Sequence, residues 1–441
     1  MADNTLDSSS SVSSSAHASS STTGELPRVF GLRDHASLWF SLGVGLLVMQ
    51  VGAYLVPAMG TQAALLAIVV GSIVGAGLLA WTAQIACERG LSSAGLMSIT
   101  LGRHFARLPV VLNIVQLLGW TAFELVVMRD GSAAIVKQLT GLEAAWVPYA
   151  ATLLWGGVLL ALARGSMLTL VRRFIGRFGL PLVIASLLWL SWQFIGLAQA
   201  QGFSAFWHRA GTGEMSTIAA VDLVMAMPVS WLPLVADYAR HGIAAGSTRR
   251  GTWLGYALAN TWCYALGVLV VSVAEPGADL VTTLLLAQGG LIALGLILVD
   301  ELDNAYGDVH SGAVSLNFLA PRRSLAGWGM VMAVASTAAA LVLPMHGLEP
   351  FLLMLSSIFV PLFGVVISQL SGHKRGHDVA IAWGPALVWI AGIAAFHLSP
   401  MVVPDLGQAI PSLVVTLGLG TLLRLLQRTD AASAQVAGVA E

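Results

Sequence analysis

Acidic residues gather in a stretch of the sequence that reads VDELDNAYGDVH, directly after the almost purely apolar GGLIALGLIL. The stretch holds five ionisable side chains, Asp300, Glu301, Asp303, Asp308 and His310. With about 100° of rotation per residue of an α-helix, most of its polar positions, Asn304 among them, lie on or beside one face, and apolar residues fill the other.

Several carboxyl groups on one buried face cannot all stay ionised at low dielectric without a cation or a proton. The acidic face therefore predicts a site for a coupling proton or cation, for which Asp300, Glu301 and Asp303 are the candidates. A structural network of polar side chains between helices is the alternative interpretation.

A second polar face occurs in LNIVQLLGWTAFELVV, where Trp120 and Glu124 are one helical turn apart and share a side with Asn113, Gln116 and, further on, Gly131. An indole ring beside a carboxyl group suits a small planar polar ligand, because the ring can stack on it and the acid can bind its N–H groups. We predict a substrate site here, and core packing of Trp120 is the alternative.

Hydrolytic chemistry would need a nucleophile with a base, or metal ligands at a spacing such as HExxH. In the sequence only His310 with Asp303 or Asp308 could form such a pair, and no second histidine lies at ligand spacing. We therefore expect no enzyme, no resident metal and no cofactor other than coupling H+ or Na+.

The composition around these faces is that of a membrane protein. Of 441 residues, 57% are hydrophobic and only 10% are charged, with a mean hydropathy of +0.82, whereas a soluble domain has about 25% charged residues. Continuous apolar runs of ~20 residues favour membrane-spanning helices over a barrel. Residues 1–24 are rich in Ser, Thr and Ala and are expected to form a disordered cytoplasmic tail.

Apolar runs separated by polar breaks predict an all-α membrane protein with twelve transmembrane helices. The expected spans are 36–58, 62–87, 107–135, 146–163, 172–197, 218–238, 251–273, 289–317, 325–344, 349–370, 379–399 and 405–425. The apolar segment 276–288 is too short for a span and is expected to form an external hairpin helix.

The positive charges predict the orientation of the chain. With the N-terminus in the cytoplasm, all Lys and Arg residues except Arg129, Lys137 and Arg209 fall on the cytoplasmic side. Cytoplasmic loops are enriched in these residues. We therefore expect a multi-pass protein of the cell (inner) membrane with both termini in the cytoplasm.

Two of the expected spans carry residues that interrupt helices. The first contains Gln50, Gly52 and Pro57, and the sixth contains Pro228 and Pro233, and proline breaks the helical hydrogen-bond ladder. The two spans hold matching places in two halves of five helices each. An odd number of spans per half inverts the second half, and broken helices at matching places of inverted repeats indicate the central site of a secondary transporter.

The resulting organisation has five parts, with the inverted halves at its centre. The parts are a tail at 1–24, a first repeat at 25–200, a second repeat at 201–375, two further helices at 376–426 and a cytoplasmic tail at 427–441. In the sixth span, Ser230 and Trp231 lie between the two prolines, and Trp231 could stack on a ligand or face lipid. Asp237 and Arg240 are expected to pair at its inner end.

Three segments resemble helices 3, 6 and 8 of the nucleobase–cation symporter-1 family. They read NIVQLLGWTAFE, AMPVSWLPLVADYAR and DELDNAYGDVHSGAVSLN. The resemblance is greatest to bacterial cytosine/purine permeases and hydroxymethylpyrimidine transporters. It implies the leucine-transporter-type fold, with a 5+5 inverted repeat followed by two helices.

The resemblance also implies roles for individual residues. In that family a helix 3 aromatic stacks on the base and a polar residue one turn later bonds it, which matches Trp120 and Glu124. A helix 8 residue that reads the base is matched by Asn304 or Asp308. The family's second stacking tryptophan would fall nearer Met227 or Pro228 than Trp231.

Sodium-coupled members of that family use carbonyl groups at the break of helix 1. Here this helix offers Met49 for the cation and Gln50 and Gly52 for the site. Helix 8 of such members has hydroxyl groups where this chain has acids, so both proton and sodium coupling remain open.

Together these features predict a symporter that imports a nucleobase, cytosine or a related pyrimidine or purine, by alternating access. Helices 1, 2, 6 and 7 would move against helices 3, 4, 8 and 9, as the resemblance implies. The alternatives are a carrier of hydroxymethylpyrimidine, a thiamine precursor, or an amino acid or amine carrier of the same fold. The expected partners are the small-molecule substrate and membrane lipid, with no nucleic acid and no obligatory protein partner.

Overall fold

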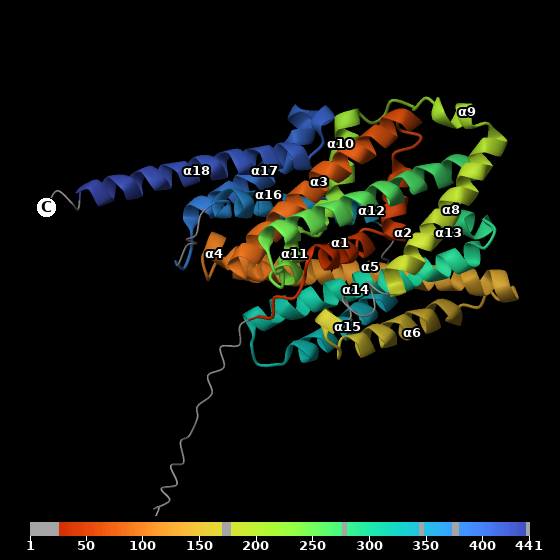
Figure 1. Ribbon diagram of the computed structural model, residues 1–441, viewed down its shortest axis with the longest axis horizontal. Coiled ribbons are helices and arrows are strands. Elements are labelled where there is room, and N and C mark those ends of the chain that lie inside the picture. Colours follow the sequence, from red (N-terminus) through yellow and green to blue (C-terminus); the bar gives the residue numbers. More distant parts are fainter. Residues whose placement is uncertain (1–25, 170–177, 276–279, 344–347, 373–378, 438–441) are drawn as a thin grey trace, which may run out of the picture.

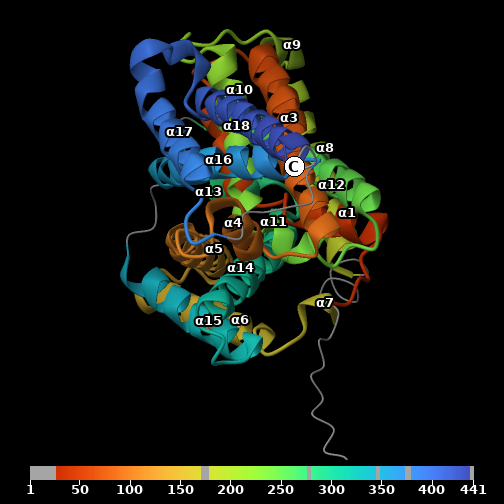
Figure 2. The ribbon, with the colours of Figure 1, turned by 90° about the vertical axis from the view of Figure 1, so that its left-hand side faces the viewer.

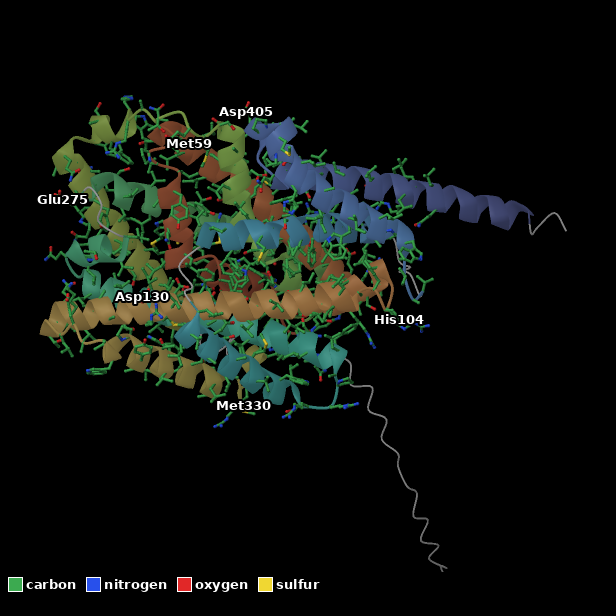
Figure 3. The ribbon with its side chains drawn as sticks, turned by 180° about the vertical axis from the view of Figure 1, so that it is seen from behind. Met59, His104, Asp130, Glu275, Met330 and Asp405 are labelled. Atoms are coloured by element: carbon green, nitrogen blue, oxygen red, sulfur yellow. The ribbon has the colours of Figure 1, made fainter. Side chains whose placement is uncertain are left out.

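The computed structural model describes residues 26–169, 178–275, 280–343, 348–372 and 379–437, and over these the chain is helical, with one isolated bridge between Phe30 and Gly242. The long helices run side by side (Figure 1). In Figure 3, His104 and Glu275 lie at opposite ends of this bundle. The expected tail at 1–24 lies outside the described residues.

Within the described residues, eight helices are long and apolar enough to cross a membrane. They are α3 (Thr61–Arg89), α5 (Arg107–Thr140), α8 (Leu180–Gln201), α12 (Ala245–Val273), α15 (Leu325–Val342), α16 (Leu348–Leu370), α17 (Trp383–Val402) and α18 (Ala409–Ala437). Two bent helix pairs raise the number to ten. The bent pairs are α1 (Leu32–Ser41) with α2 (Leu46–Tyr54), and α10 (Thr217–Ser230) with α11 (Leu232–Ala239).

Two further helices coincide with expected spans. They are α6 (Trp146–Leu162) and α14 (Gly290–Leu319), which carries the acidic face. The total of twelve spans stays a prediction. The remaining elements are short: α4 (Ser93–Leu101), α7 (Met167–Thr169), α9 (Phe203–Trp207), α13 (Leu280–Leu286) and the 3-10 turn η2 (Pro404–Leu406). The short helix expected within 276–288 is thus α13, and the start of the expected span 172–197 lies outside the described residues.

The first broken helix is bent by 63°, but its break lies earlier than predicted. The chain leaves the helix after Ser41 and resumes it at Leu46. Gly43 faces Ala259 of α12, where a Cβ atom would come within 2.9 Å of the alanine Cβ. Small residues pack closely at this break, whereas Gln50 and Gly52, expected near it, lie inside α2.

The second broken helix is bent by 41° at Trp231, between Pro228 and Pro233, as the sequence predicts. The expected ion pair at its inner end is replaced by other contacts. The Asp237 carboxylate accepts the Ser93 N–H at 3.1 Å, at the start of α4, and Arg240 donates to the Asp237 carbonyl at 3.2 Å. A helix N-terminus provides unpaired N–H groups that such a carboxylate satisfies.

The helices pack into two groups that meet at the broken segments. In the first group α12 packs on α1, α2 and α3, and α3 packs on α10. In the second, α14 and α15 pack on α5 and α6, and Figure 2 shows these four together in the lower part of the molecule. This grouping agrees with the expected division into helices 1, 2, 6, 7 and 3, 4, 8, 9. The last two helices, α17 and α18, pack with α16.

Candidate substrate and cation site

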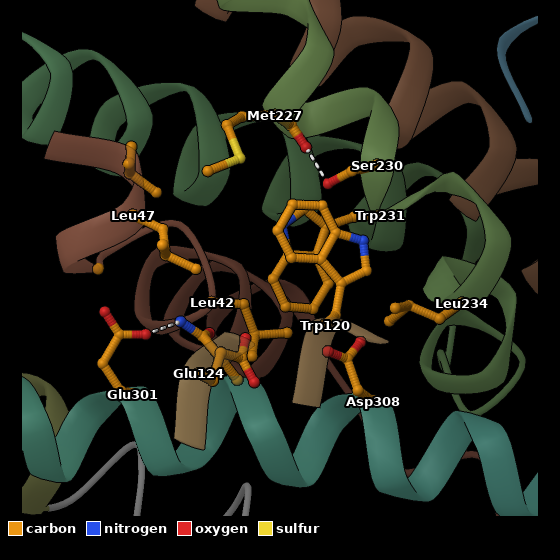
Figure 4. A pocket seen from close by; sticks show the side chains of 13 residues that line it. Leu42, Leu47, Trp120, Glu124, Met227, Ser230, Trp231, Leu234, Glu301 and Asp308 are labelled. Carbon is orange, nitrogen blue, oxygen red and sulfur yellow. Dashed lines mark hydrogen bonds between the residues drawn. The ribbon is translucent and has the colours of Figure 1, made fainter. Parts of the chain in front are cut away.

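A pocket lies where both broken helices face α5 and α14 (Figure 4). Thirteen residues line it, Leu42, Gly45, Leu47, Val48, Trp120, Glu124, Met227, Ser230, Trp231, Leu234, Glu301, Asn304 and Asp308. Its free volume is about 30 Å³, the space of one or two waters. A planar ring would therefore enter only as the lining side chains move apart.

Two indole rings, Trp120 from α5 and Trp231 from the break between α10 and α11, belong to this lining (Figure 4). Each is held edge-on by another ring. Phe351 lies 5.2 Å from Trp120 at 74°, and Trp39 lies 6.0 Å from Trp231 at 86°. Trp231 is 9% exposed and lines the pocket, so its ring does not face lipid.

Polar atoms without partners surround these rings. Glu124 Oε2, Asn304 Oδ1 and Trp120 Nε1 are buried and have no hydrogen-bond partner among the residues that the structure describes. A buried polar atom without a partner costs about 1–3 kcal/mol. These atoms are therefore suited to receive the polar edge of a ligand, and Asp308 adds a further carboxyl group to the lining.

Glu301 is held differently, because both of its oxygens are used within the protein. One accepts the Leu46 N–H at 2.5 Å, at the first residue of α2, and the other accepts from the Asn304 amide at 3.3 Å. The same amide donates to the Val44 carbonyl at 3.1 Å, inside the break. An acid from α14 thus occupies the positive N-terminal end of the half-helix α2.

A second acidic group lies where α1 ends. The Ser41 hydroxyl is 2.8 Å from Asp300 Oδ1 and 3.3 Å from Asp303 Oδ2. Asp300 Oδ2 is buried and unpartnered within the described part of the chain. Asp300 and Asp303 therefore lie together at the break, beside the pocket rather than in its lining.

The remaining predicted site residues are placed as follows. Ser230 lines the pocket, with its hydroxyl donating to the Met227 carbonyl at 2.7 Å. Gln50 lines a separate, larger cavity. Met49 and Gly52 are buried against α12, near Gly267 and Tyr264 respectively, so the structure does not bring them to the pocket.

Other polar residues of the two faces make contacts between helices. Asn113 of α5 donates to the Pro233 carbonyl at 3.1 Å and to the Ser315 hydroxyl at 3.2 Å, and Gln116 donates to Asn113 at 2.8 Å. At this end of α5, the polar side chains therefore bond to protein groups and do not line the pocket.

Sequence reasoning missed Ser41 at the end of α1 and the lining residues Leu42, Gly45, Leu47, Val48 and Leu234. A Cβ atom on Gly45 would lie 2.9 Å from the Glu301 Oε1 atom, so the glycine is what lets the acid approach α2. The glycine pair in SLGVG was the available signal.

Two broken helices at matching places, with a buried polar pocket between them, define a secondary transporter. The family comparison agrees: a model of the family described as "permease for cytosine/purines, uracil, thiamine, allantoin" matches residues 24–381. The chain belongs to this family of permeases, and it is a transporter rather than an enzyme. A search of curated proteins found no match.

Solved structures show the same leucine-transporter fold. Mhp1, a nucleobase-cation-symport-1 family transporter, in a closed conformation with bromovinylhydantoin bound, has a TM-score of 0.74 at 17% identity, over 92% of this chain and 96% of that one. Its inward-facing conformation gives 0.69 at 18%, over 91% and 92%. A Na+-coupled sialic acid symporter in a substrate-bound outward-open state gives 0.62 at 13%, over 90% of each chain.

Proposed function

We propose that this protein imports a nucleobase or a related planar nitrogen heterocycle, with cytosine as the leading substrate, by symport with a cation. The observation that carries the proposal is the pocket itself. It combines the rings of Trp120 and Trp231 with the unpaired carboxylate oxygen of Glu124. Stacking on an aromatic face is worth about 1–3 kcal/mol per base, and the carboxylate can bind N–H groups at the edge of the ring.

The contact between Glu301 and α2 argues against the amino acid alternative. In carriers with broken helices, the N-terminus of a half-helix points at an anionic group of the substrate. Here Glu301 already accepts the first N–H of α2, at 2.5 Å from Leu46. A substrate carboxylate would have to displace Glu301 and would meet the carboxyl groups of Glu124 and Asp308 in the same pocket.

The coupling site in this proposal is formed by Ser41, Asp300 and Asp303. A serine hydroxyl has one hydrogen to donate, whereas it lies within hydrogen-bonding distance of two carboxyl groups. The second contact is favourable when one acid carries a proton and donates to the hydroxyl oxygen. This geometry supports a proton as the coupling ion, with sodium as the alternative.

A cavity beside the pocket supports alternating access. It has a volume of about 640 Å³, is lined by α2, α5, α12 and α13, and shares Leu47 with the pocket. With the termini in the cytoplasm, as the positive charges favour, this cavity faces outward and Leu47 separates it from the pocket.

Uptake of radiolabelled cytosine into proteoliposomes tests the proposal. The purified protein is assayed under an inward proton gradient, an inward sodium gradient, or neither. Accumulation driven by the proton gradient, and strongly reduced in Glu124→Gln, is expected. Accumulation driven only by sodium would reassign the coupling ion, and no cytosine uptake under any gradient would refute cytosine as the substrate.

A further inference from the structure

The pocket has many hydrogen-bond acceptors and few donors. Glu124 Oε2 and Asn304 Oδ1 are acceptors without a partner in the described part of the chain, and Asp308 adds a carboxyl group. Against these stands one unpartnered donor, the indole N–H of Trp120. A ligand that satisfies such a lining must itself be rich in N–H donors.

The charge of the lining also favours a ligand that is rich in N–H donors. Three carboxyl groups, those of Glu124, Glu301 and Asp308, line the pocket, and none of its thirteen lining residues is Lys, Arg or His. Glu301 is committed to the α2 N-terminus and to Asn304. Glu124 has no such partner, although a buried charge needs a counter-charge or a proton.

We infer, resting on the proposed function, that the substrate is a basic aminoheterocycle, which binds Glu124 through a ring nitrogen and the exocyclic amine beside it. The two Glu124 oxygens face these two nitrogen atoms. One proton is shared between the ring nitrogen and Glu124: it arrives on the base or comes from the carboxylic acid, and the complex is the same. The second amine hydrogen is left for Asn304 Oδ1 or Asp308.

This arrangement distinguishes cytosine from uracil, two substrates that the description of the family names together. In uracil the amine is replaced by a carbonyl oxygen, which adds an acceptor to a pocket that already has a surplus. The rings of Trp120 and Trp231 favour the same choice, because a planar cation is attracted to an indole face. Basic aminopyrimidines and aminopurines are therefore the preferred class, and oxo rings without the amine are the poor ligands.

Calorimetric binding of cytosine and uracil to the purified full-length protein tests the inference. Cytosine is expected to bind at least about tenfold more tightly, as one unpaired buried group implies. Among cytosines that carry fluorine, hydrogen or methyl on the same ring carbon, affinity should rise with the basicity of the ring nitrogen. Equal affinity for cytosine and uracil would overturn the inference, whereas binding of neither base would also remove the proposed function.

Two variants make the assignment to Glu124 specific. In Glu124→Gln the amide can pair with either base, so the preference for cytosine should fall to within about threefold and the dependence on ring basicity should vanish. Glu301→Gln is the matched control, with the same change in the same pocket. This variant should weaken the binding of both bases equally and keep the ratio of their affinities. If the ratio were lost in Glu301→Gln but kept in Glu124→Gln, Glu124 would not be the acid that contacts the base.

Discussion

The Ser41 hydroxyl donates to Asp300 across 2.8 Å and so joins the end of α1 to the acidic face of α14. Its oxygen is also 3.3 Å from Asp303. The contact links the two groups of helices that move against each other in the proposed mechanism. Coupling requires that cation and substrate favour the same arrangement of these groups.

Ser41→Ala should therefore uncouple transport from the cation gradient. We expect accumulation of labelled substrate under a proton gradient to fall by about tenfold or more, the effect of ~1.4 kcal/mol of lost coupling, while exchange across the membrane without a gradient persists. Ser186→Ala is the control, because the hydroxyl of this α8 residue donates within its own helix, to the Leu182 carbonyl at 3.1 Å. Wild-type accumulation by Ser41→Ala would show that the serine has no part in coupling.

Trp120→Ala should weaken base binding. Loss of a stacking ring costs about 1–3 kcal/mol, so the Kd for cytosine should rise by roughly five- to 150-fold. Trp192→Ala is a matched control, since this ring of α8 is 75% exposed on the outside of the bundle. An aliphatic amine that competed as well as cytosine, and was unaffected by Trp120→Ala, would favour the amine carrier.

Gly45→Ala should disturb the N-terminus of α2 without changing the tryptophan rings of the pocket. The added Cβ would lie 2.9 Å from Glu301 Oε1, which is closer than such atoms pack, so the carboxylate must shift and its bond to the Leu46 N–H weakens. We expect transport to fall by about tenfold, the effect of ~1.4 kcal/mol, since the contact of the α2 N-terminus with Glu301 is disturbed, with folding followed by thermal unfolding. Gly77→Ala is the control, because nothing lies within 4 Å of a Cβ there. Equal transport by the two variants would contradict this role of Glu301.

The helices could be predicted from the sequence because each expected span is an apolar run, and such a run has few alternatives in a membrane. The pairing of Trp120 with Glu124 was equally accessible, since it depends only on helical spacing. The second break was marked by prolines. The first break has no proline, and at it Gly43 packs against Ala259 of another helix, a contact that the sequence does not reveal.

The contacts of the individual acidic residues could not be predicted from the sequence. Glu301 and Asp303 are two residues apart, yet one binds the start of α2 and the other contacts the end of α1. Both contacts span more than 250 residues of chain. Spacing on one helix gives the face on which an acid lies, but the element opposite that face decides what the acid does.

Asp222 of α10 is another acid whose contacts depend on a distant element. In the structure it accepts three backbone N–H groups at the start of α18. The distances are 2.9 Å to Gln408, 3.0 Å to Ala409 and 2.6 Å to Ile410. A carboxylate at a helix N-terminus satisfies donors that have no partner inside the helix and interacts favourably with the helix dipole.

Asp222→Ala should therefore lower the stability of the protein, because three N–H groups lose their acceptor at a buried contact between α10 and α18. Loss of an N-cap costs about 0.5–2 kcal/mol, and thermal unfolding in detergent should show a lower Tm. Asp222→Asn keeps one acceptor oxygen, so its Tm should lie between those of the wild type and Asp222→Ala. Asp405→Ala changes an exposed acid nearby (Figure 3) and should leave Tm unchanged. If Asp405→Ala lowered Tm as much as Asp222→Ala, the effect would come from surface charge, and the cap would contribute little to holding α18 against α10.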